Sequence, residues 1–185
     1  RQKSKTYHQQ RKSMFLSIKP ITTQDKNYTL AKEIYTSSFP KEERRDVKDW
    51  EKLIDESSNF SLNIIQKNNS VLGIITLWDF TSFLYIEHFA IKKEFQNNGF
   101  GKEILEKISK NFLKPIILEI EIPNNDLSKR RLQFYKRNGF NEYPEKYIQP
   151  SYRNDICRIE MILMHKKEFP FTTAKETIYQ QVYNL

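Results

Sequence analysis

Residues 96–102 read QNNGFGK and lie between an apolar segment, residues 83–91, and a segment with helical spacing of apolar side chains, residues 99–110. Glycines at a strand-to-helix junction let backbone N–H groups approach an anion, and the first turn of a helix carries partial positive charge. Lys102 adds a full positive charge beside these groups. This stretch therefore predicts a site for a phosphate or pyrophosphate group.

Two common nucleotide-binding motifs do not fit the same stretch. Its spacing differs from the GxxxxGK pattern, followed by Ser or Thr, of nucleoside triphosphate sites. Ile104 stands where the dinucleotide motif GxGxxG has its third glycine. From these residues alone, a helix that begins with glycines and binds nothing is an equally good interpretation.

Strand and helix patterns alternate on both sides of this stretch. Asn68 and Asn69 predict a hairpin turn, and we expect Pro20 to end the first strand. We expect strands over residues 14–18, 60–64, 71–78, 83–91, 116–122, 143–148 and 156–164, and helices over residues 27–35, 47–54, 99–110, 126–138 and 173–183. Up to residue 164 the order β-α-α-β-β-β-α-β-α-β-β predicts an α/β domain with a mixed sheet.

Composition and charge exclude several classes of protein. Hydrophobic residues make up 38% of the 185 residues, which is enough for a packed core. The net charge is +8, but residues 1–13 hold five basic side chains and no acidic one. We predict no specific nucleic-acid partner, because nucleic-acid domains carry their basic excess on a folded surface. No apolar run is long enough to span a bilayer, so we predict no membrane partner.

The chain divides into three parts. We interpret residues 1–13 as a basic tail, either disordered or a remnant of cloning, residues 14–165 as one domain, and residues 166–185 as a C-terminal extension. Cys157 is the single cysteine, so the chain has no internal disulfide and, with three histidines, no zinc framework. We therefore predict a cytoplasmic location and no metal.

A second pattern lies one predicted strand downstream of the first, where residues 128–140 read SKRRLQFYKRNGF. The two patterns together resemble the GNAT superfamily of N-acetyltransferases, over about residues 14–165. The residues that match the family motifs are Gln96, Gly99 and Gly101 in the first pattern and Tyr135, Gly139 and Phe140 in the second. Ser128 departs from the family's usual Asn, and Arg131 departs from its usual small residue.

The resemblance implies a fold and a cosubstrate. Such proteins have a mixed, mostly antiparallel central sheet flanked by helices, with the fourth and fifth strands splayed apart. Acetyl-CoA would lie in the splay, with its pantetheine arm along the backbone of Phe89, Ala90 and Ile91. Its other predicted contacts are Gln96, Asn97, Asn98, Gly99, Phe100, Gly101 and Lys102 around the pyrophosphate, and Ser128 by motif position.

The resemblance also implies an activity, which is direct acetyl transfer to an amine of a small molecule or a peptide. The alternative is a CoA-binding module that has lost turnover and works as a sensor or scaffold. Neither interpretation identifies the acceptor, and both allow a monomer or a homodimer.

Two residues are candidates for catalysis. By motif position, Tyr135 would donate a proton to the departing thiolate. Glu87 could remove a proton from the amine, directly or through water, because a lysine-type ammonium has an ordinary pKa near 10.4. Strand alternation puts Glu87 on the same face as Tyr85 and Phe89, and His88 on the other. The alternatives are core packing for Tyr135 and a structural or substrate-orienting role for Glu87.

Three further features are candidates to line an acceptor pocket. They are the charged run over residues 38–45, the carboxylates of Glu119 and Glu121, and the aromatic turn over residues 147–152. Each is also typical of solvated surface or loop packing. We expect Cys157 to pack on the last strand rather than to act as a nucleophile.

Overall fold

The computed structural model describes residues 15–153 and 158–185. Within these residues eight strands form one sheet in the order β1-β2-β3-β4-β5-β8-β6, and β7 also pairs with β8. The strands are β1 (Ser17–Ile21), β2 (Phe60–Lys67), β3 (Ser70–Asp79), β4 (Leu84–Ile91), β5 (Ile116–Glu121), β6 (Asn141–Glu142), β7 (Tyr147–Gln149) and β8 (Ile159–Lys166). Only β4 and β5 pair in parallel within the described sheet, so the predicted mixed, mostly antiparallel architecture is confirmed.

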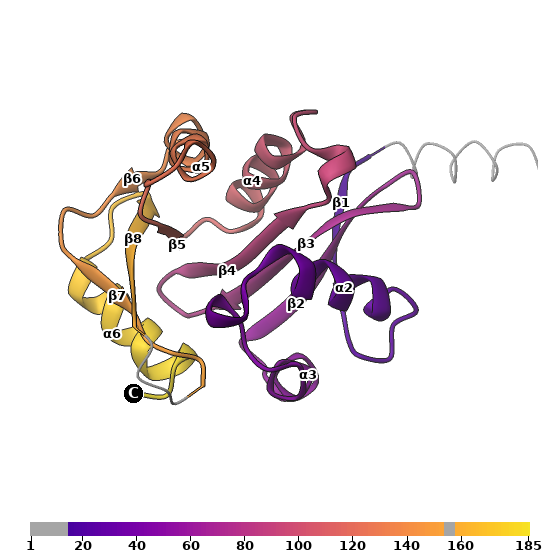
Figure 1. Ribbon diagram of the computed structural model, residues 1–185, viewed down its shortest axis with the longest axis horizontal. Helices are drawn as coiled ribbons and strands as arrows, with labels where there is room; N and C mark the ends of the chain where they lie inside the picture. Colours follow the sequence, from indigo (N-terminus) through magenta and orange to yellow (C-terminus); the bar gives the residue numbers. More distant parts are fainter. Residues whose placement is uncertain (1–14, 154–157) are drawn as a thin grey trace, which may run out of the picture.

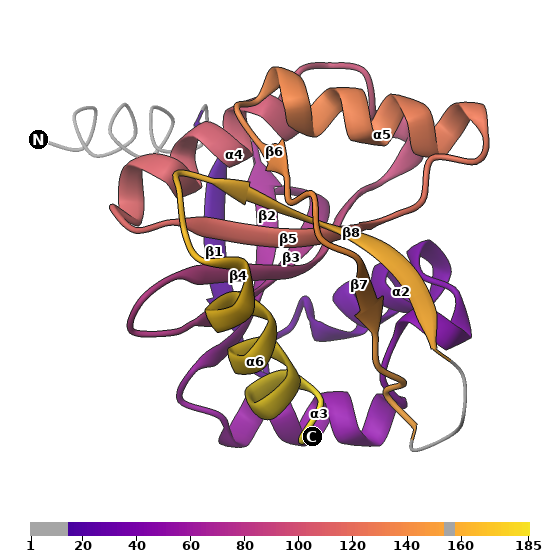
Figure 2. The same cartoon turned by 90° about the vertical axis from the view of Figure 1, so that its left-hand side faces the viewer.

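Helices cover both faces of the sheet (Figure 1). On one face lie α4 (Phe100–Asn111) and α5 (Asp126–Arg137), and on the other lie α2 (Tyr28–Ser38), α3 (Val47–Glu56) and α6 (Phe171–Val182). Figure 2 shows α4 and α5 above the sheet and α3 and α6 below it. Two short 3-10 turns, η1 (Lys41–Glu43) and η2 (Lys93–Phe95), precede α3 and α4. Each face therefore has its own apolar core.

The hairpin between β2 and β3 forms at the predicted position. Asn68 and Asn69 both have positive φ, 51° and 66°, as a tight two-residue hairpin turn requires. The prediction of the hairpin is confirmed by the antiparallel pairing of the two strands.

Asp46 occupies the N-cap of α3, although its side chain makes no capping hydrogen bond.

The first strand differs from its prediction. It runs over residues 17–21 and passes through Pro20, which lies opposite Asn63 of β2. A proline fits there because β1 is an edge strand, where a missing backbone N–H removes no bond to a further strand. The prediction that Pro20 ends this strand is therefore wrong, and Met14 lies outside the described residues.

The strands that follow α5 are shorter and more divided than predicted. Of the single extended segment expected over residues 143–148, only Tyr147 and Ile148 lie in a strand, β7, while the separate strand β6 lies just before it; the two pair with different parts of β8. The last strand begins at Ile159 and ends at Lys166, beyond its predicted end. Residues 154–157, including the predicted start of that strand, lie outside the described residues.

The parallel strands β4 and β5 pair over only three residue pairs, from Leu84–Ile116 to Ile86–Leu118. Beyond Ile86 the two strands separate, as the resemblance predicts (Figure 1). The backbone of the second half of β4 therefore has β3 on one side and no strand on the other.

Helix α6 belongs to the packed core of the domain. Its inner side chains Ala174, Ile178 and Val182 recur every four residues and are all buried. They lie in the same core as the inner faces of α2 and α3. The segment that we predicted as an extension thus covers the sheet beneath β5 and β8 (Figure 2).

We expect Ile178→Ala to lower the free energy of unfolding by about 2–5 kcal/mol, because the side chain is 0% exposed and its removal leaves a cavity. Leu113→Ala is the control, since Leu113 is 83% exposed and surface changes stay within about 0.5 kcal/mol. Urea unfolding curves measure both. Equal midpoints for Ile178→Ala and the wild type would mean that α6 does not contribute to the core.

Candidate active site

β4 carries an extra residue at the point where β5 leaves it. In the pairing of β3 with β4, Leu77 lies opposite Ile86 and Thr76 lies opposite His88, so Glu87 is inserted as a β-bulge. The pairing of β4 with β5 ends at Ile86. Glu87 is therefore both the bulged residue and the first residue of the opening.

The bulge changes which face the next side chains occupy. Glu87 accepts a hydrogen bond from Trp78, and His88 packs edge-on against Tyr35 at a centroid distance of 5.0 Å, both in the core below the sheet. Phe89 packs in the opposite core, under α4. The prediction that Glu87 shares a face with Phe89 while His88 points away is therefore wrong, because alternation breaks at an inserted residue.

Glu87 is a fully buried carboxylate with three donors. It pairs with Arg45, Trp78 Nε1 donates to its Oε2 at 3.0 Å, and the Tyr152 hydroxyl donates to its Oε1 at 3.0 Å. Burial by itself would raise the pKa of Glu87, but the charges of Arg45 and His88 and the hydrogen bonds from Arg45 and Trp78 together outweigh burial, and the pKa is lowered. A carboxylate held ionised in this way favours the orienting role that the sequence left open.

Arg45 connects three segments that are far apart in the sequence. Its guanidinium pairs with Glu87 of β4, and its Nη2 donates to the carbonyl of Val182 at the end of α6, at 2.7 Å. Its backbone N–H donates to the Tyr35 hydroxyl of α2 at 3.0 Å. Arg45 is only 7% exposed, so these partners replace the water that a guanidinium loses on burial.

Glu119 has the position on β5 that Glu87 has on β4. It directly follows Leu118, the last residue of β5 that pairs with β4. Its Oε1 accepts from the Gln149 side chain and from the Tyr183 hydroxyl, the latter at 2.8 Å. Burial raises the pKa of Glu119, and the hydrogen bonds offset this only in part. Glu119 therefore holds a proton more readily than an ordinary glutamate.

The first turn of α4 presents uncapped backbone N–H groups. Gly99 is the N-cap residue, with a φ of 78° in the left-handed region, and no side chain within the described ranges caps this helix. A Cβ built at Gly99 would meet nothing within 4 Å, so the space beside it is open. Lys67 Nζ lies 4.9 Å from the centroid of the Phe100 ring, which brings a second cation, besides Lys102, to this turn.

The remaining residues of the first motif shape the loop before α4. Gln96 Nε2 donates to the Ile91 carbonyl at 2.8 Å, and the Asn98 side chain donates to the Gln96 carbonyl at 2.9 Å. Asn97 has a positive φ of 63°. These contacts hold the loop against the open half of β4.

The two motifs touch each other through Gly101. A Cβ built there would lie 2.9 Å from Phe134 Cζ, so α4 and α5 approach closely only because this residue lacks a side chain. Tyr135 follows Phe134 on α5 and is 7% exposed. Burial raises the pKa of Tyr135 to about 12, so the hydroxyl keeps its proton at neutral pH. Tyr135 is therefore suited to donate a proton.

The Ser128 hydroxyl is engaged within the protein. It accepts from the backbone N–H of Asn125 at 3.1 Å, and the Ser128 N–H donates to Asn125 Oδ1 at 2.9 Å. This reciprocal pair is a capping box at the start of α5, and Ser128 is 1% exposed. A contact between this hydroxyl and a cosubstrate would have to compete with the cap.

The three features predicted for an acceptor pocket meet around the opening. Glu43 of η1 is partly buried and faces Glu121 and Glu119 of β5, and burial with the repulsion of these carboxylates raises its pKa. Glu121 pairs with Arg131 of α5. Tyr152, from the third feature, reaches Glu87 directly. The opening thus has carboxylates on both sides.

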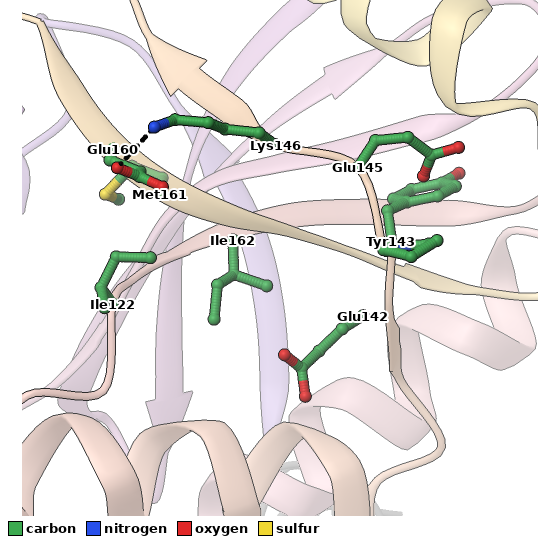
Figure 3. Close-up of a pocket in the computed structure, with 9 residues that line it drawn as sticks. Ile122, Glu142, Tyr143, Glu145, Lys146, Glu160, Met161 and Ile162 are labelled. Carbon is green, nitrogen blue, oxygen red and sulfur yellow. Dashed lines mark ion pairs between the residues drawn. The ribbon is translucent and has the colours of Figure 1, made fainter.

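Two cavities differ in their relation to this site. One of about 600 Å³ lies between α3, the end of α6 and the chain after β7, and its lining includes Arg45, Trp78, Tyr152 and Tyr183. The other, of about 510 Å³, lies where residues 142–146 pass β8 (Figure 3). In Figure 3 Lys146 reaches toward Glu160, and the two form an ion pair at 3.0 Å. Neither lining includes a predicted catalytic or cosubstrate residue, but the first cavity has Arg45 and Tyr152 from the predicted acceptor features and the second has none, so we assign the acceptor side of the site to the first.

Nothing in the sequence indicates a role for Tyr183 or distinguishes Arg45 within its charged run. Tyr183 follows α6, in the segment predicted as an extension, and Arg45 is one of several neighbouring charges. The buried spacing of Ile178 and Val182 was the available signal for α6. No local pattern marks the partners of Arg45, because they lie 42 and 137 residues away.

Within residues 15–153 and 158–185, no group of three or more His, Cys, Asp or Glu side chains is placed to hold a metal ion. No helix in this part of the chain is long and apolar enough to cross a membrane. The predicted tail, residues 1–13, and Cys157 lie outside the described residues.

The sequence model of the acetyltransferase (GNAT) family matches residues 25–140. The chain belongs to this family. A GNAT-family acetyltransferase from Bacteroides thetaiotaomicron superposes with a TM-score of 0.87 at 34% identity, covering 91% of this chain and 99% of that chain. YjbC of Bacillus subtilis (strain 168), whose name assigns it to the acetyltransferases, is 31% identical over 104 residues. That match covers 55% of this chain and 52% of YjbC, so it spans about half of the relative's length.

The fold is also that of more distant GNAT proteins. A GNAT-family acetyltransferase from Elizabethkingia anophelis, solved with acetyl-CoA bound, superposes with a TM-score of 0.53 at 20% identity. The match covers 83% of this chain and 98% of that chain. At this identity the comparison establishes the shared GNAT fold.

We expect Arg45→Met to destabilise the protein by about 3–5 kcal/mol at pH 7, because it leaves the Glu87 carboxylate buried without its counter-charge. In the wild type the pKa of Glu87 is lowered, so its stabilising contribution is present above the ordinary carboxyl pKa and is lost as pH falls. Without Arg45 the effect of burial on Glu87 prevails, so the pKa of Glu87 rises. The loss of unfolding free energy relative to the wild type should therefore be smaller at pH 5.

Urea unfolding at pH 7 and pH 5 measures this difference. Arg45→Met combined with Glu87→Leu should recover most of the loss, since both charges are then absent. If Arg45→Met loses the same unfolding free energy at both pH values, the loss comes from packing and not from the ion pair.

Proposed function

We propose that this protein transfers the acetyl group of acetyl-CoA directly to the amine of a small molecule or a peptide. The observation that carries the proposal is the opening between β4 and β5 beside the uncapped first turn of α4. A strand with one unpaired side can hold an extended ligand through its backbone. Membership of the GNAT family supports the same activity.

The first turn of α4 fits the pyrophosphate of acetyl-CoA. Its uncapped N–H groups and the helix dipole favour an anion, and Gly99 leaves room for one. Lys67 and Lys102 add charge there. We propose that the pantetheine arm lies along Phe89, Ala90 and Ile91. The other residues proposed from the motifs to contact the cosubstrate are Gln96, Asn97, Asn98, Phe100, Gly101 and Ser128.

The chemistry requires a neutral amine and a proton for the leaving group. Bound acetyl-CoA supplies an activated thioester carbonyl for attack by the amine. We propose that Tyr135, whose hydroxyl keeps its proton at neutral pH, protonates the departing thiolate. We propose that Glu87, fixed by Arg45, orients the acceptor, while its role as a base stays a prediction.

The acceptor is proposed to be an amine that carries positive charge. Carboxylates line both sides of the opening, where Glu43 faces Glu119 and Glu121. Such a field concentrates cations near the site. A cytoplasmic location and a monomeric or homodimeric state stay predictions.

We expect saturating acetyl-CoA to raise the melting temperature. At about 100 times its Kd a ligand stabilises by roughly 2.7 kcal/mol, which corresponds to about 5–10 °C for a domain of this size. Gly99→Asn should abolish the rise, because Asn tolerates positive φ but fills the open space beside α4. Gly139→Asn is the matched control, since Gly139 also has a positive φ, 84°, but follows α5.

Thermal denaturation with and without acetyl-CoA compares the three proteins. A wild-type melting curve that acetyl-CoA leaves unmoved contradicts the assignment of the ligand. A rise in melting temperature without release of CoA in the presence of aminoglycosides, polyamines, amino acids and peptides would instead identify the sensor or scaffold.

We expect Tyr135→Phe to lower kcat by about 10²–10⁴ while the Kd for CoA stays near that of the wild type, because only the donated proton is lost. Tyr143→Phe is the control, since it removes a hydroxyl that donates to the Phe169 carbonyl at 2.6 Å outside the site. Steady-state rates at saturating substrates and calorimetric titration of CoA provide the two quantities. A kcat near the wild-type value for Tyr135→Phe would refute its role as the acid.

A further inference from the structure

The two carboxylates at the opening are connected by a chain of tyrosine hydroxyls. Tyr152 OH lies 3.0 Å from Glu87 Oε1, and Tyr183 OH lies 2.8 Å from Glu119 Oε1. The two hydroxyls lie 3.2 Å from each other. Four groups from β4, β5, the chain after β7 and the end of α6 therefore form three successive oxygen–oxygen contacts.

The chain of hydroxyls between Glu87 and Glu119 can hold one proton more than the two tyrosines supply. Each hydroxyl carries one proton, so two protons serve three contacts when both carboxylates are ionised. Tyr152 then donates to Glu87, Tyr183 donates to Glu119, and the contact between the tyrosines has no proton. With one added proton on Glu119, its carboxyl donates to Tyr183, Tyr183 to Tyr152, and Tyr152 to Glu87, so every contact is a hydrogen bond.

The environment of the two ends decides where that proton is held. Glu87 has Arg45 as a counter-charge and Trp78 as a second donor, both of which stabilise the ionised form. Glu119 has the neutral Gln149 as its other donor, and its Oε2 is buried without a hydrogen-bond partner among the described residues. The added proton therefore belongs at Glu119.

The middle of the chain lies beside a cavity that an acceptor can occupy. Tyr152 and Tyr183 both contribute to the lining of the cavity of about 600 Å³, next to Arg45. Glu119 is at the first position of β5 beyond its pairing with β4. The hydroxyl chain thus connects this cavity with the opening where the acetyl group is proposed to lie.

We propose that Glu119 is the final acceptor of the proton that the acceptor ammonium must lose, and that the Tyr183 hydroxyl transmits it. This inference rests on the proposed function. The ammonium gives one proton to the Tyr183 oxygen while Tyr183 gives its own to Glu119, which leaves a neutral amine and a protonated Glu119. The amine nitrogen then bonds to the acetyl carbon, the carbon–sulfur bond breaks, and the thiolate takes a proton from Tyr135. The second proton that leaves the nitrogen passes to solvent, and Glu119 and Tyr135 then return to their starting states by exchange with solvent.

Several titratable or charged groups lie near Glu119 and influence how the charge of its carboxyl changes with pH. Two buried hydroxyls, of Tyr85 and Tyr147, lie close enough to stabilise its charged form without forming regular hydrogen bonds. Among the described residues these groups include Tyr85 from β4, Tyr147 from β7, Tyr152 from the following segment, Tyr179 and Tyr183 from α6 and its end, and Glu43 from η1. Glu43 and, through the two tyrosines, Glu87 are the other carboxyls.

The kinetic test uses Glu119→Gln and Tyr183→Phe in the full chain. Each should lower kcat/KM by about 10²–10⁴ at pH 7, and the double variant should lose no more than either single variant, because the two groups act as one unit. Activity of Glu119→Gln should recover as the pH approaches the pKa of the amine, whereas Tyr135→Phe should not recover. Glu160→Gln and Tyr143→Phe are the matched controls and should keep wild-type rates, because both side chains lie at the other cavity.

A second measurement does not depend on activity. The raised pKa of Glu119 means that the folded state binds this proton more tightly than the unfolded state does. The wild type should therefore lose stability relative to Glu119→Gln as pH rises from the ordinary carboxyl pKa through the raised value. Melting temperatures of the two proteins between pH 4 and pH 8 give this difference.

The outcomes separate this inference from the proposed function. If the wild type transfers acetyl to no amine, the function fails, and the pH dependence of the melting temperatures alone decides whether Glu119 holds the proton. A melting-temperature difference that does not change with pH overturns the inference. Additive losses in the double variant, or no recovery of Glu119→Gln at high pH, overturn it as well and leave acetyl transfer in place.

Discussion

Beyond Ile86 and Leu118, β4 and β5 no longer satisfy each other's backbone hydrogen bonds. A sheet that opens in its interior needs other partners there, because a buried polar group without one costs about 1–3 kcal/mol. On the α6 side, Arg45, Tyr152 and Tyr183 hold the side chains of Glu87 and Glu119, the first residues beyond the pairing. On the α4 side, the uncapped first turn of that helix has open space beside Gly99. The separation of the two strands is the constraint around which both groups of residues are arranged.

The bulge at Glu87 explains why the closed face carries so much charge. An inserted residue turns two consecutive side chains, Glu87 and His88, toward the same core. One of them is a carboxylate, and burial favours its protonated form unless a counter-charge lies beside it. Arg45 provides it and, through the Val182 carbonyl, also fixes the end of α6. A local irregularity in one strand thereby determines where a helix nearly a hundred residues later must end.

The sequence was sufficient for the elements whose signals are local. The hairpin at Asn68 and Asn69, the glycine at the start of α4 and the order of strands and helices follow from turn chemistry and periodicity. Periodicity failed at Glu87, because a bulge leaves no mark in the alternation of a mostly apolar strand. It also could not show that α6 joins the core, since burial depends on which surface the helix meets.

The candidate site, too, could be predicted from the sequence only where its residues are close together in the chain. Its proposed cosubstrate half consists of two short motifs whose members are close in sequence, so their resemblance to the motifs of the GNAT family could predict them. The other half joins Arg45, Glu119, Tyr152 and Tyr183, which come from four separate segments. Nothing in the spacing of these residues indicates that they meet. Only the three-dimensional fold brings the two carboxylates to matching positions on the separating strands.

The two halves of the site also differ in their relation to the family. The residues that match the GNAT model end at 140, so they include both motifs but neither Tyr152 nor Tyr183. The two motifs and both carboxylates of the hydroxyl chain therefore lie within the family match, while the two tyrosines that connect the carboxylates come from the segment after it. The pKa values of the two carboxylates are shifted in opposite directions, which fits the proposed roles of Glu87 as a fixed anion and Glu119 as the acceptor of a proton. In that proposal Tyr183, which directly follows α6, supplies one link, so part of the proton path lies in a region that the two motifs do not reach.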